Sequence, residues 1–365
     1  MNATNGMRLA TLALAAIVTL SCTGDGARAG TSFAGKTIIW TVPNSPGGGS
    51  GRIAQFLAPF LTKYLPGHPT ISISYQPGGG SIRGANQFAS HAKSDGLHLL
   101  ITTGSTQLPF LLGDPRVKYD YKDWRIIMVM PTGGVVYTTP RLGIHGPSDI
   151  ARLANKRLIY ANQGATSLDL IPLLAFRLLG LKVEHVFGYR ARADGRLAFE
   201  RGDVNIDYQT TPAFLKSVRP MVESGTAIPL FSWGVLGKDG KLERDPTFPD
   251  LPNFDEVYET LRGKAPSGPE YETYMSIFTT EFLAQKMVFV PKDTPDAIVE
   301  TYEAALKAIT EDPDYKAEVA NVLGDYRLTI GKEAQALFHR GTTIRHADRK
   351  SITRILSDYG VNLSK

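Results

Sequence analysis

The 365-residue chain contains a single cysteine, Cys22, which lies among the first thirty residues. The remainder therefore has no disulfide, no thiolate metal site and no cysteine nucleophile. Long hydrophobic runs are also missing. The apolar run at residues 9–20 is shorter than the roughly 20 residues that a bilayer span needs, and no later run reaches that length. We expect no membrane-spanning helix in the mature protein.

Charge of one sign is not concentrated anywhere in the chain. The 40 basic and 35 acidic residues are spread along it, and the formal net charge is +5. Arginines do not interleave with aromatic residues either, so the composition gives little support for nucleic-acid binding. A mild positive field favours anionic ligands, although physiological salt limits its reach to about 8 Å.

Motifs for catalysis and metal binding are equally scarce. The chain has no G-x-S-x-G, H-E-x-x-H or EF-hand spacing, and its seven histidines are scattered. His339 and His346 could share one helical face, but no clustered acids accompany them. Hydroxyls and glycines without a general base fit binding better than catalysis. We expect no enzyme activity, no metal and no cofactor.

The N-terminal segment has the pattern of an export signal. Arg8 precedes the short apolar run, which is typical of a secretory signal peptide. Ala27-Arg28-Ala29 is an A-x-A cleavage site, so we expect a signal peptide at residues 1–29 and a periplasmic mature protein. Lipidation of Cys22 stays the alternative, although Thr19 stands where a leucine usually precedes such a cysteine.

Strands and helices alternate in two series after this segment, and a chain of this length has room for about two domains. A repeated β-α pattern is typical of mainly parallel sheets flanked by helices, so we expect an α/β protein with two lobes. The predicted strands are residues 38–43, 71–75 and 97–102, then 125–130, 135–138, 158–161, 183–187, 204–208 and 228–233, and finally 287–290. The predicted division is 30–128 plus 227–365 for the first lobe and 129–226 for the second.

Two stretches near the C-terminus depart from the alternation. Residues 237–275 are rich in Gly, Pro, Lys and Asp, and we interpret them as a long surface excursion. The tail beyond residue 294 is predicted to be helical. Thr294-Pro295-Asp296 and Asp312-Pro313-Asp314 are start signals for two helices, and a last helix carries apolar residues from Leu337 to Leu356.

Two glycine-rich loops each follow a predicted strand and precede a predicted helix, at residues 43–51 and 76–81. Glycines let backbone N–H groups converge on a ligand, and a helix N-terminus carries about half a positive charge. The first loop is neither a P-loop nor G-x-G-x-x-G, because Arg52 interrupts both motifs. Both loops lie at carboxyl ends of strands, where open α/β sheets bind ligands, so we expect an anion site there.

Small polar residues extend this predicted site. Thr103-Gly104-Ser105-Thr106 ends the third strand, and the loop at residues 162–167 occupies the matching place in the second series. Each lobe thus offers donor-rich loops to a shared cleft. The charged residues near the second-lobe loops are interpreted as solvated or helix-capping charges. They are Asp169, Arg190, Arg192 and Asp207.

With these loops, the chain resembles the substrate-binding proteins of tripartite tricarboxylate transporters, the TctC or Bug family. The resemblance runs from about residue 38 to the C-terminus. The matching stretches are VPNSPGGGS (42–50), QPGGGSIRGAN (76–86), DGLHLLITTGST (95–106), YDYKDW (119–124), YANQGATSLDL (160–170) and FVPKDTPDAIV (289–299). The family implies a two-lobe periplasmic binding protein fold, type II-like, with the ligand cleft between the lobes.

The resemblance also implies a set of ligand contacts in these loops. Those carried over from the family pattern are Asn44, Gly48, Ser50, Gly79, Gly80, Ser105, Thr166, Ser167, Tyr208 and Gln209, and the same loops add Ser45, Gly49, Ser81 and Gly164. Two positions depart from the family. Gly51 replaces an acid that usually follows the first loop, and Gln76 replaces an arginine. The substrate is therefore expected to differ from that of commoner members.

The function implied by the resemblance is capture of a small organic carboxylate by hinge closure, followed by delivery to the membrane subunits of a tripartite tricarboxylate-type transporter. We expect a monomer. One alternative keeps the fold and makes the chain a sensor that presents a bound acid to a signalling receptor. A less favoured alternative is a periplasmic hydrolase, which rests only on the serines of the cleft.

Overall fold

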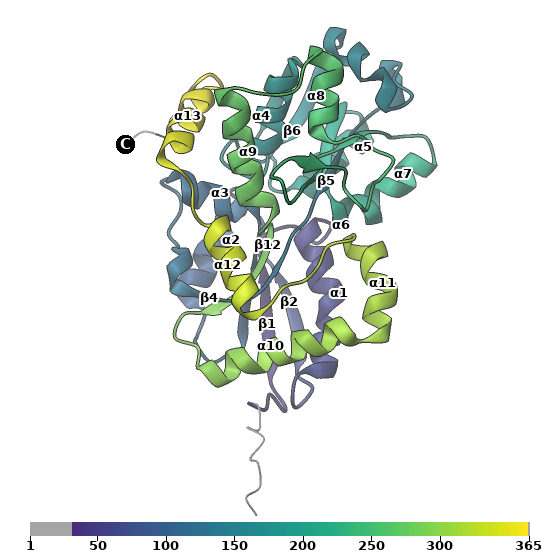
Figure 1. Ribbon diagram of the computed structural model, residues 1–365. Coiled ribbons are helices and arrows are strands. Elements are labelled where there is room, and N and C mark those ends of the chain that lie inside the picture. Colours follow the sequence, from purple (N-terminus) through teal and green to yellow (C-terminus); the bar gives the residue numbers. More distant parts are fainter. Residues whose placement is uncertain (1–30, 364–365) are drawn as a thin grey trace, which may run out of the picture.

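A computed structural model describes residues 31–363, and in it the chain forms two α/β lobes, one above the other in Figure 1. The expected signal peptide, its cleavage site after Ala29 and Cys22 lie outside these residues. Within the described range, every helix is too short or too polar to cross a bilayer.

The first lobe is built on a five-stranded sheet with the order β2-β1-β3-β12-β4. β1 runs parallel to β2 and β3, whereas β12 pairs antiparallel with β3 and β4. The predicted strands are confirmed to within two residues at either end. Their bounds are β1 Thr37–Val42, β2 Thr70–Tyr75, β3 His98–Thr102, β4 Trp124–Met130 and β12 Lys286–Pro291.

Helices cover this sheet with apolar stripes, and α11 packs on α1 and α10. In α1, Ile53, Leu57 and Leu61 recur at the helical period and are buried in the first-lobe core. The predicted helix runs unbroken through Pro59, whose exposed ring lies on the solvent side. The helices of this lobe are α1 Gly49–Tyr64, α2 Ile82–His91, α3 Gly104–Leu112, α10 Asp296–Glu311, α11 Pro313–Leu323 and α12 Gly331–Gly341.

The C-terminal start signals are partly confirmed. Asp312 accepts from the N–H groups of Asp314 and Tyr315, as an N-cap residue does. Thr294 does not cap α10, which begins at Asp296 without a capping side chain in the described structure. The predicted last helix is two helices, α12 and α13 His346–Ser357.

The second lobe contains the antiparallel sheet β8-β5-β9 and the parallel pair β6-β7, so the expectation of a mainly parallel sheet is wrong for this lobe. Asn205 joins the two parts: its N–H donates to the Ile159 carbonyl at 3.1 Å, and its Oδ1 accepts from the Ile159 N–H at 2.8 Å. The strands are β5 Gly134–Thr138, β6 Leu158–Asn162, β7 Val183–Phe187, β8 Ile206–Thr210 and β9 Ile228–Ser232. The helices are α4 Leu170–Leu179, α5 Arg192–Arg201, α6 Thr211–Ala213 and α7 Arg219–Glu223, with a π-helical turn at 214–218 between the last two.

The predicted return to the first lobe at residue 227 comes too early. β9 begins one residue later, and it pairs with β5 in the second lobe. The next strand of the first sheet is β12. The alternation of strands could not reveal this, because the pairing partner of a strand depends on tertiary contacts.

The predicted surface excursion at 237–275 is also wrong, since much of it is folded and buried. It contains β11 Leu242–Glu243, which pairs with β10 Val235–Leu236, then α8 Phe254–Arg262 and the start of α9 Pro269–Phe282. Phe254 and Tyr274 are completely buried. The physical reason is α4, which is apolar on nearly every side and needs α8 and α9 to cover it.

Two crossings between the lobes lie side by side. One is the short linker from β4 to β5, and the other runs from the end of α9 into β12 (Figure 1). They are joined by a hydrogen bond from the Thr132 N–H to the Phe282 carbonyl at 3.3 Å. Such paired linkers are the natural place for a hinge.

Candidate functional site

The two glycine-rich loops of the first lobe meet at one edge of its sheet. They follow β1 and β2, which are adjacent and parallel, so their carboxyl ends lie together. The hydroxyl of Ser81 donates to Oδ1 of Asn44 at 2.8 Å and so joins one loop to the other. Ser81 is buried and has φ of 76°, a left-handed conformation that a side-chain contact stabilises here.

The helices that begin at these loops are uncapped. In the described structure, neither α1, with Gly48 as N-cap, nor α2, with Ser81, has a capping side chain or an acid in its first turn. By contrast, α3 is closed by a capping box between Thr103 and Thr106. The first N–H groups of a helix have no carbonyl partner inside it, and they carry partial positive charge. The positive ends of both helices therefore favour an anion, although the N–H groups of Ile82 and Arg83 in α2 already donate to the carbonyls of Gly79 and Gly78.

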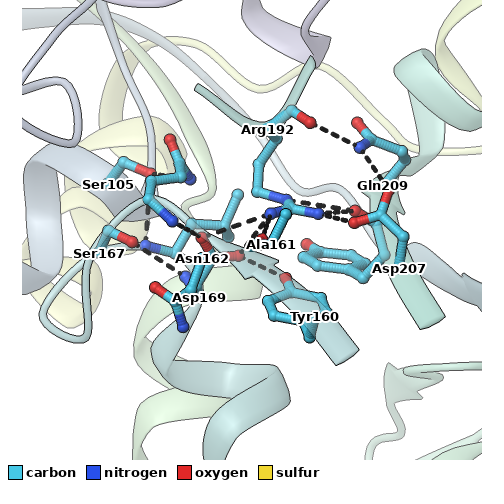
Figure 2. Close-up of polar contacts among 12 residues, drawn as sticks. Ser105, Tyr160, Ala161, Asn162, Ser167, Asp169, Arg192, Asp207 and Gln209 are labelled. Atoms are coloured by element: carbon cyan, nitrogen blue, oxygen red, sulfur yellow. Dashed lines mark hydrogen bonds and ion pairs between the residues drawn. The ribbon is translucent and has the colours of Figure 1, made fainter. Parts of the chain in front are cut away.

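The second-lobe loop at residues 162–167 lies directly against these elements. Oγ of Ser105 accepts from Gln163 Nε2 at 3.2 Å and from the Leu168 N–H at 3.3 Å. The hydroxyl of Thr166 donates to Asp114 of the first lobe at 2.9 Å. These bonds hold the lobes in contact on this side, and Figure 2 shows those at Ser105.

Glycines permit the closest approaches between the lobes. A β-carbon on Gly80 would lie 3.5 Å from Cβ of Ser167. A β-carbon on Gly49 would lie only 2.2 Å from Oγ1 of Thr210, at the end of β8. The structure thus brings the first-lobe loops and both second-lobe segments together, as the sequence predicted.

Several predicted contact residues are already engaged with the protein. The Ser167 hydroxyl donates to the Gly164 carbonyl at 2.6 Å. Gln209 donates to the Arg192 carbonyl at 2.9 Å, and it lies with Tyr208 on β8, beneath the loops. None of the predicted loop hydroxyls hydrogen-bonds to a histidine within residues 31–363.

The interpretation of the second-lobe charges as solvated is wrong for three of the four. Arg192 is 6% exposed, and Asp169 and Asp207 are completely buried. Arg192 forms an ion pair with each of them, 3.3 Å from Asp169, and its guanidinium lies 4.8 Å from the ring centre of Tyr160 (Figure 2). Burial alone would lower the pKa of Arg192, but Asp169 and the neighbouring tyrosines raise it overall. Arg190 is exposed and pairs with Asp194 at 3.3 Å.

This ion network positions the second-lobe loop. Asp169 accepts from the hydroxyl of Tyr160 and, at 2.7 Å, from the N–H of Gln163. Arg192 also donates to the carbonyls of Ala161 and Tyr208. The network therefore links the carboxyl ends of β6 and β8 to the loop that contacts Ser105.

Two buried charged residues at the junction were missed in the sequence. Glu281 is near the end of α9, and Lys286 opens β12; both are 1% exposed or less. Burial raises the pKa of Glu281 well above its usual range, and burial lowers the pKa of Lys286 to about 7. The only signal in the sequence was a lysine at the start of an otherwise apolar strand.

A further contact joins the lobes through residues of the folded excursion. The hydroxyl of Tyr326, in the linker between α11 and α12, donates to the buried carboxylate of Asp245 and lies 2.8 Å from Oγ1 of Thr211. Burial raises the pKa of Asp245.

Among the described residues, no group of three or more His, Cys, Asp or Glu side chains is arranged as metal ligands would be.

Comparison with known proteins identifies the fold. No family model matches the sequence, and no curated protein does. Among solved structures, periplasmic binding protein BugD has a TM-score of 0.65 at 20% identity, covering 90% of this chain and 99% of its own. MatC from Rhodopseudomonas palustris, solved with bound malate, has a TM-score of 0.64 at 18% identity. That match covers 88% of this chain and 100% of MatC. Rpa4515 from R. palustris, solved with adipate, has a TM-score of 0.65 at 18% identity. That match covers 88% of this chain and 98% of Rpa4515. The chain has the two-lobe fold of these periplasmic binding proteins.

Proposed function

We propose that this chain is a periplasmic solute-binding receptor of the TctC or Bug type, which captures a small organic carboxylate between its lobes. The observation that carries the proposal is the meeting of two uncapped helix starts, those of α1 and α2, with the donor-rich second-lobe loop. Such an arrangement binds anions through backbone N–H groups and helix dipoles.

The fold supplies a way to capture the ligand. The paired crossings at Thr132 and Phe282 are the proposed hinge about which the lobes rotate. A carboxylate that contacts both lobes stabilises the closed form by its differential affinity for that form. The fold likeness to proteins solved with malate and adipate supports a carboxylate as the ligand.

Delivery to a transporter completes the proposal. The closed form presents one continuous surface made from both lobes, and the membrane subunits of a tripartite tricarboxylate-type transporter would recognise it. We propose that the receptor acts as a monomer, released into the periplasm by removal of its signal peptide.

Native mass spectrometry of the purified protein, followed by calorimetric titration with mono-, di- and tricarboxylates, tests the proposal. Binding of at least one acid is expected, with an increase in melting temperature that grows with ligand concentration. The corresponding neutral amides serve as matched controls, because they keep the shape and remove the charge. Absence of binding by every acid, or equal binding of an acid and its amide, would contradict the proposal.

A further inference from the structure

Lys286 is a buried lysine without a partner. It opens β12, directly after the crossing from α9, and it is 1% exposed. Within residues 31–363 no side chain forms an ion pair or a hydrogen bond with its ammonium group. A buried charge is costly unless it is paired, so this position calls for an explanation.

The lysine lies beside the start of α1. A β-carbon on Gly49, the first residue of that helix, would be 3.7 Å from Cε of Lys286. The ammonium group is therefore close to a helix start that has no acid in its first turn. Two positive features converge there, and only an anion would make the arrangement favourable.

Two buried polar groups of the second lobe also lack partners. Tyr208 and Trp233 pack with ring centres 5.2 Å apart, and in the described structure neither the Tyr208 hydroxyl nor the Trp233 Nε1 has a hydrogen-bond partner. Both side chains are completely buried. Both groups can donate a hydrogen bond, as the ammonium does.

Glu281 is the acid whose charge acts on Lys286, but the two form no ion pair within residues 31–363. Its carboxyl group is more than an ion-pair distance from Lys286, and one of its oxygens, Oε2, is buried without a partner among the described residues. Burial raises its pKa well above the usual range, and the charge of Lys286 partly opposes this shift. The next carboxylate, Asp169, is already held by Arg192, Tyr160 and Gln163.

We infer that Lys286 is the charged contact for a carboxylate group of the ligand, and that it makes the site selective for organic acids without an amino group. The inference rests on the proposed carboxylate-binding function and adds to it a specific side chain and a narrower substrate class. An ammonium group on the ligand would meet Lys286 and the positive start of α1, which has no acid in its first turn, and no carboxylate of residues 31–363 forms an ion pair with Lys286.

Calorimetric titration of malate, adipate and aspartate into the wild type and Lys286→Met tests the inference. Malate carries a hydroxyl group at the carbon where aspartate carries an amino group. The ratio of their dissociation constants therefore measures the selectivity. We expect the wild type to bind malate or adipate and to bind aspartate at least about 10-fold more weakly. Lys286→Met should lose about 10-fold to 100-fold in affinity for the bound dicarboxylate.

The pH profile separates a contact role from a structural one. Because Lys286 binds an anion only when protonated, wild-type affinity should fall as pH rises above about 7, and Lys286→Met should lose this dependence. The Glu281→Gln variant should keep this pH dependence of the affinity. The other groups that face this cluster are Tyr208, which stays neutral in this range because burial raises its pKa, Asp169 and Arg192.

Lys316→Met, at an exposed lysine paired with Glu311, is the matched control and should bind as the wild type does. Unchanged affinity and pH profile in Lys286→Met would overturn the inference, and so would binding of aspartate tighter than that of malate. Failure of the wild type to bind malate, adipate and every other carboxylate would instead refute the proposed function. A melting temperature of Lys286→Met equal to or above that of the wild type confirms that the variant is folded.

Discussion

Gly49 and Thr210 belong to opposite lobes and lie so close that a β-carbon on Gly49 would be 2.2 Å from Oγ1 of Thr210. The backbone of Gly49 is not among those with positive φ, so its conformation suits alanine. The glycine is needed for space alone. The closed arrangement of the lobes therefore depends on the absence of a side chain at the start of α1.

Gly49→Ala should weaken carboxylate binding by about 10-fold or more, because the added methyl group obstructs closure. Thr210→Ala in the same chain should restore much of the affinity, since it removes Oγ1 and leaves Cβ at 3.4 Å. Titration calorimetry and the radius of gyration from small-angle scattering measure both effects. Gly146→Ala is the control, because no atom lies within 4 Å of its added carbon. Equal affinities in Gly49→Ala and the wild type would show that closure does not need this contact.

Replacement of Arg192 by methionine should lower the free energy of unfolding by about 3–5 kcal/mol, because it leaves Asp169 and Asp207 buried without their cation. Urea unfolding followed by fluorescence measures the change. Arg190→Met removes an exposed arginine two positions away, and it should stay within about 0.5 kcal/mol of the wild type. A similar small loss in both variants would mean that the buried ion pairs contribute little.

Stability should rise with pH between about 7 and 10 because of Lys286. Its pKa falls from 10.5 to about 7 on folding, so in this range the unfolded chain binds more protons than the folded one. The contribution reaches at most about 1.4 kcal/mol per pH unit. The difference in unfolding free energy between the wild type and Lys286→Met, measured by urea titration at several pH values, isolates this effect. A difference that does not vary with pH would contradict a buried, titrating lysine.

Tyr326→Phe should favour the open form by about 1–3 kcal/mol, because it removes the hydroxyl that donates to Asp245 across the lobes. Asp245 keeps a hydrogen bond from the Thr247 N–H at 2.9 Å, so the second lobe should stay folded. Small-angle scattering of the unliganded protein would report a larger radius of gyration. Tyr75→Phe is the control, since its hydroxyl contacts only the exposed Gln55. An unchanged radius of gyration in Tyr326→Phe would exclude this contact as a determinant of closure.

The sequence predicted the elements whose signals are local. Ile53, Leu57 and Leu61 recur at the helical period and define α1 wherever that helix packs. Asp312 starts α11 because its carboxylate reaches N–H groups only two and three residues away. The glycine-rich loops were also placed correctly, because each follows a strand and the carboxyl ends of parallel strands lie at the same edge of a sheet. The Asn44–Ser81 hydrogen bond joins the two loops there.

What the sequence by itself determined, then, is the place of each main-sheet strand along the chain, the two-lobe α/β class and the edge where the loops gather. Only the tertiary structure decided that Phe254 and Tyr274 are buried, that β9 belongs to the second sheet, and that Arg192 and Lys286 are removed from water. Burial depends on which distant segments pack together. A charged side chain looks the same in the sequence whether solvent or another lobe covers it, so its pKa and its use in binding follow from the folded arrangement alone.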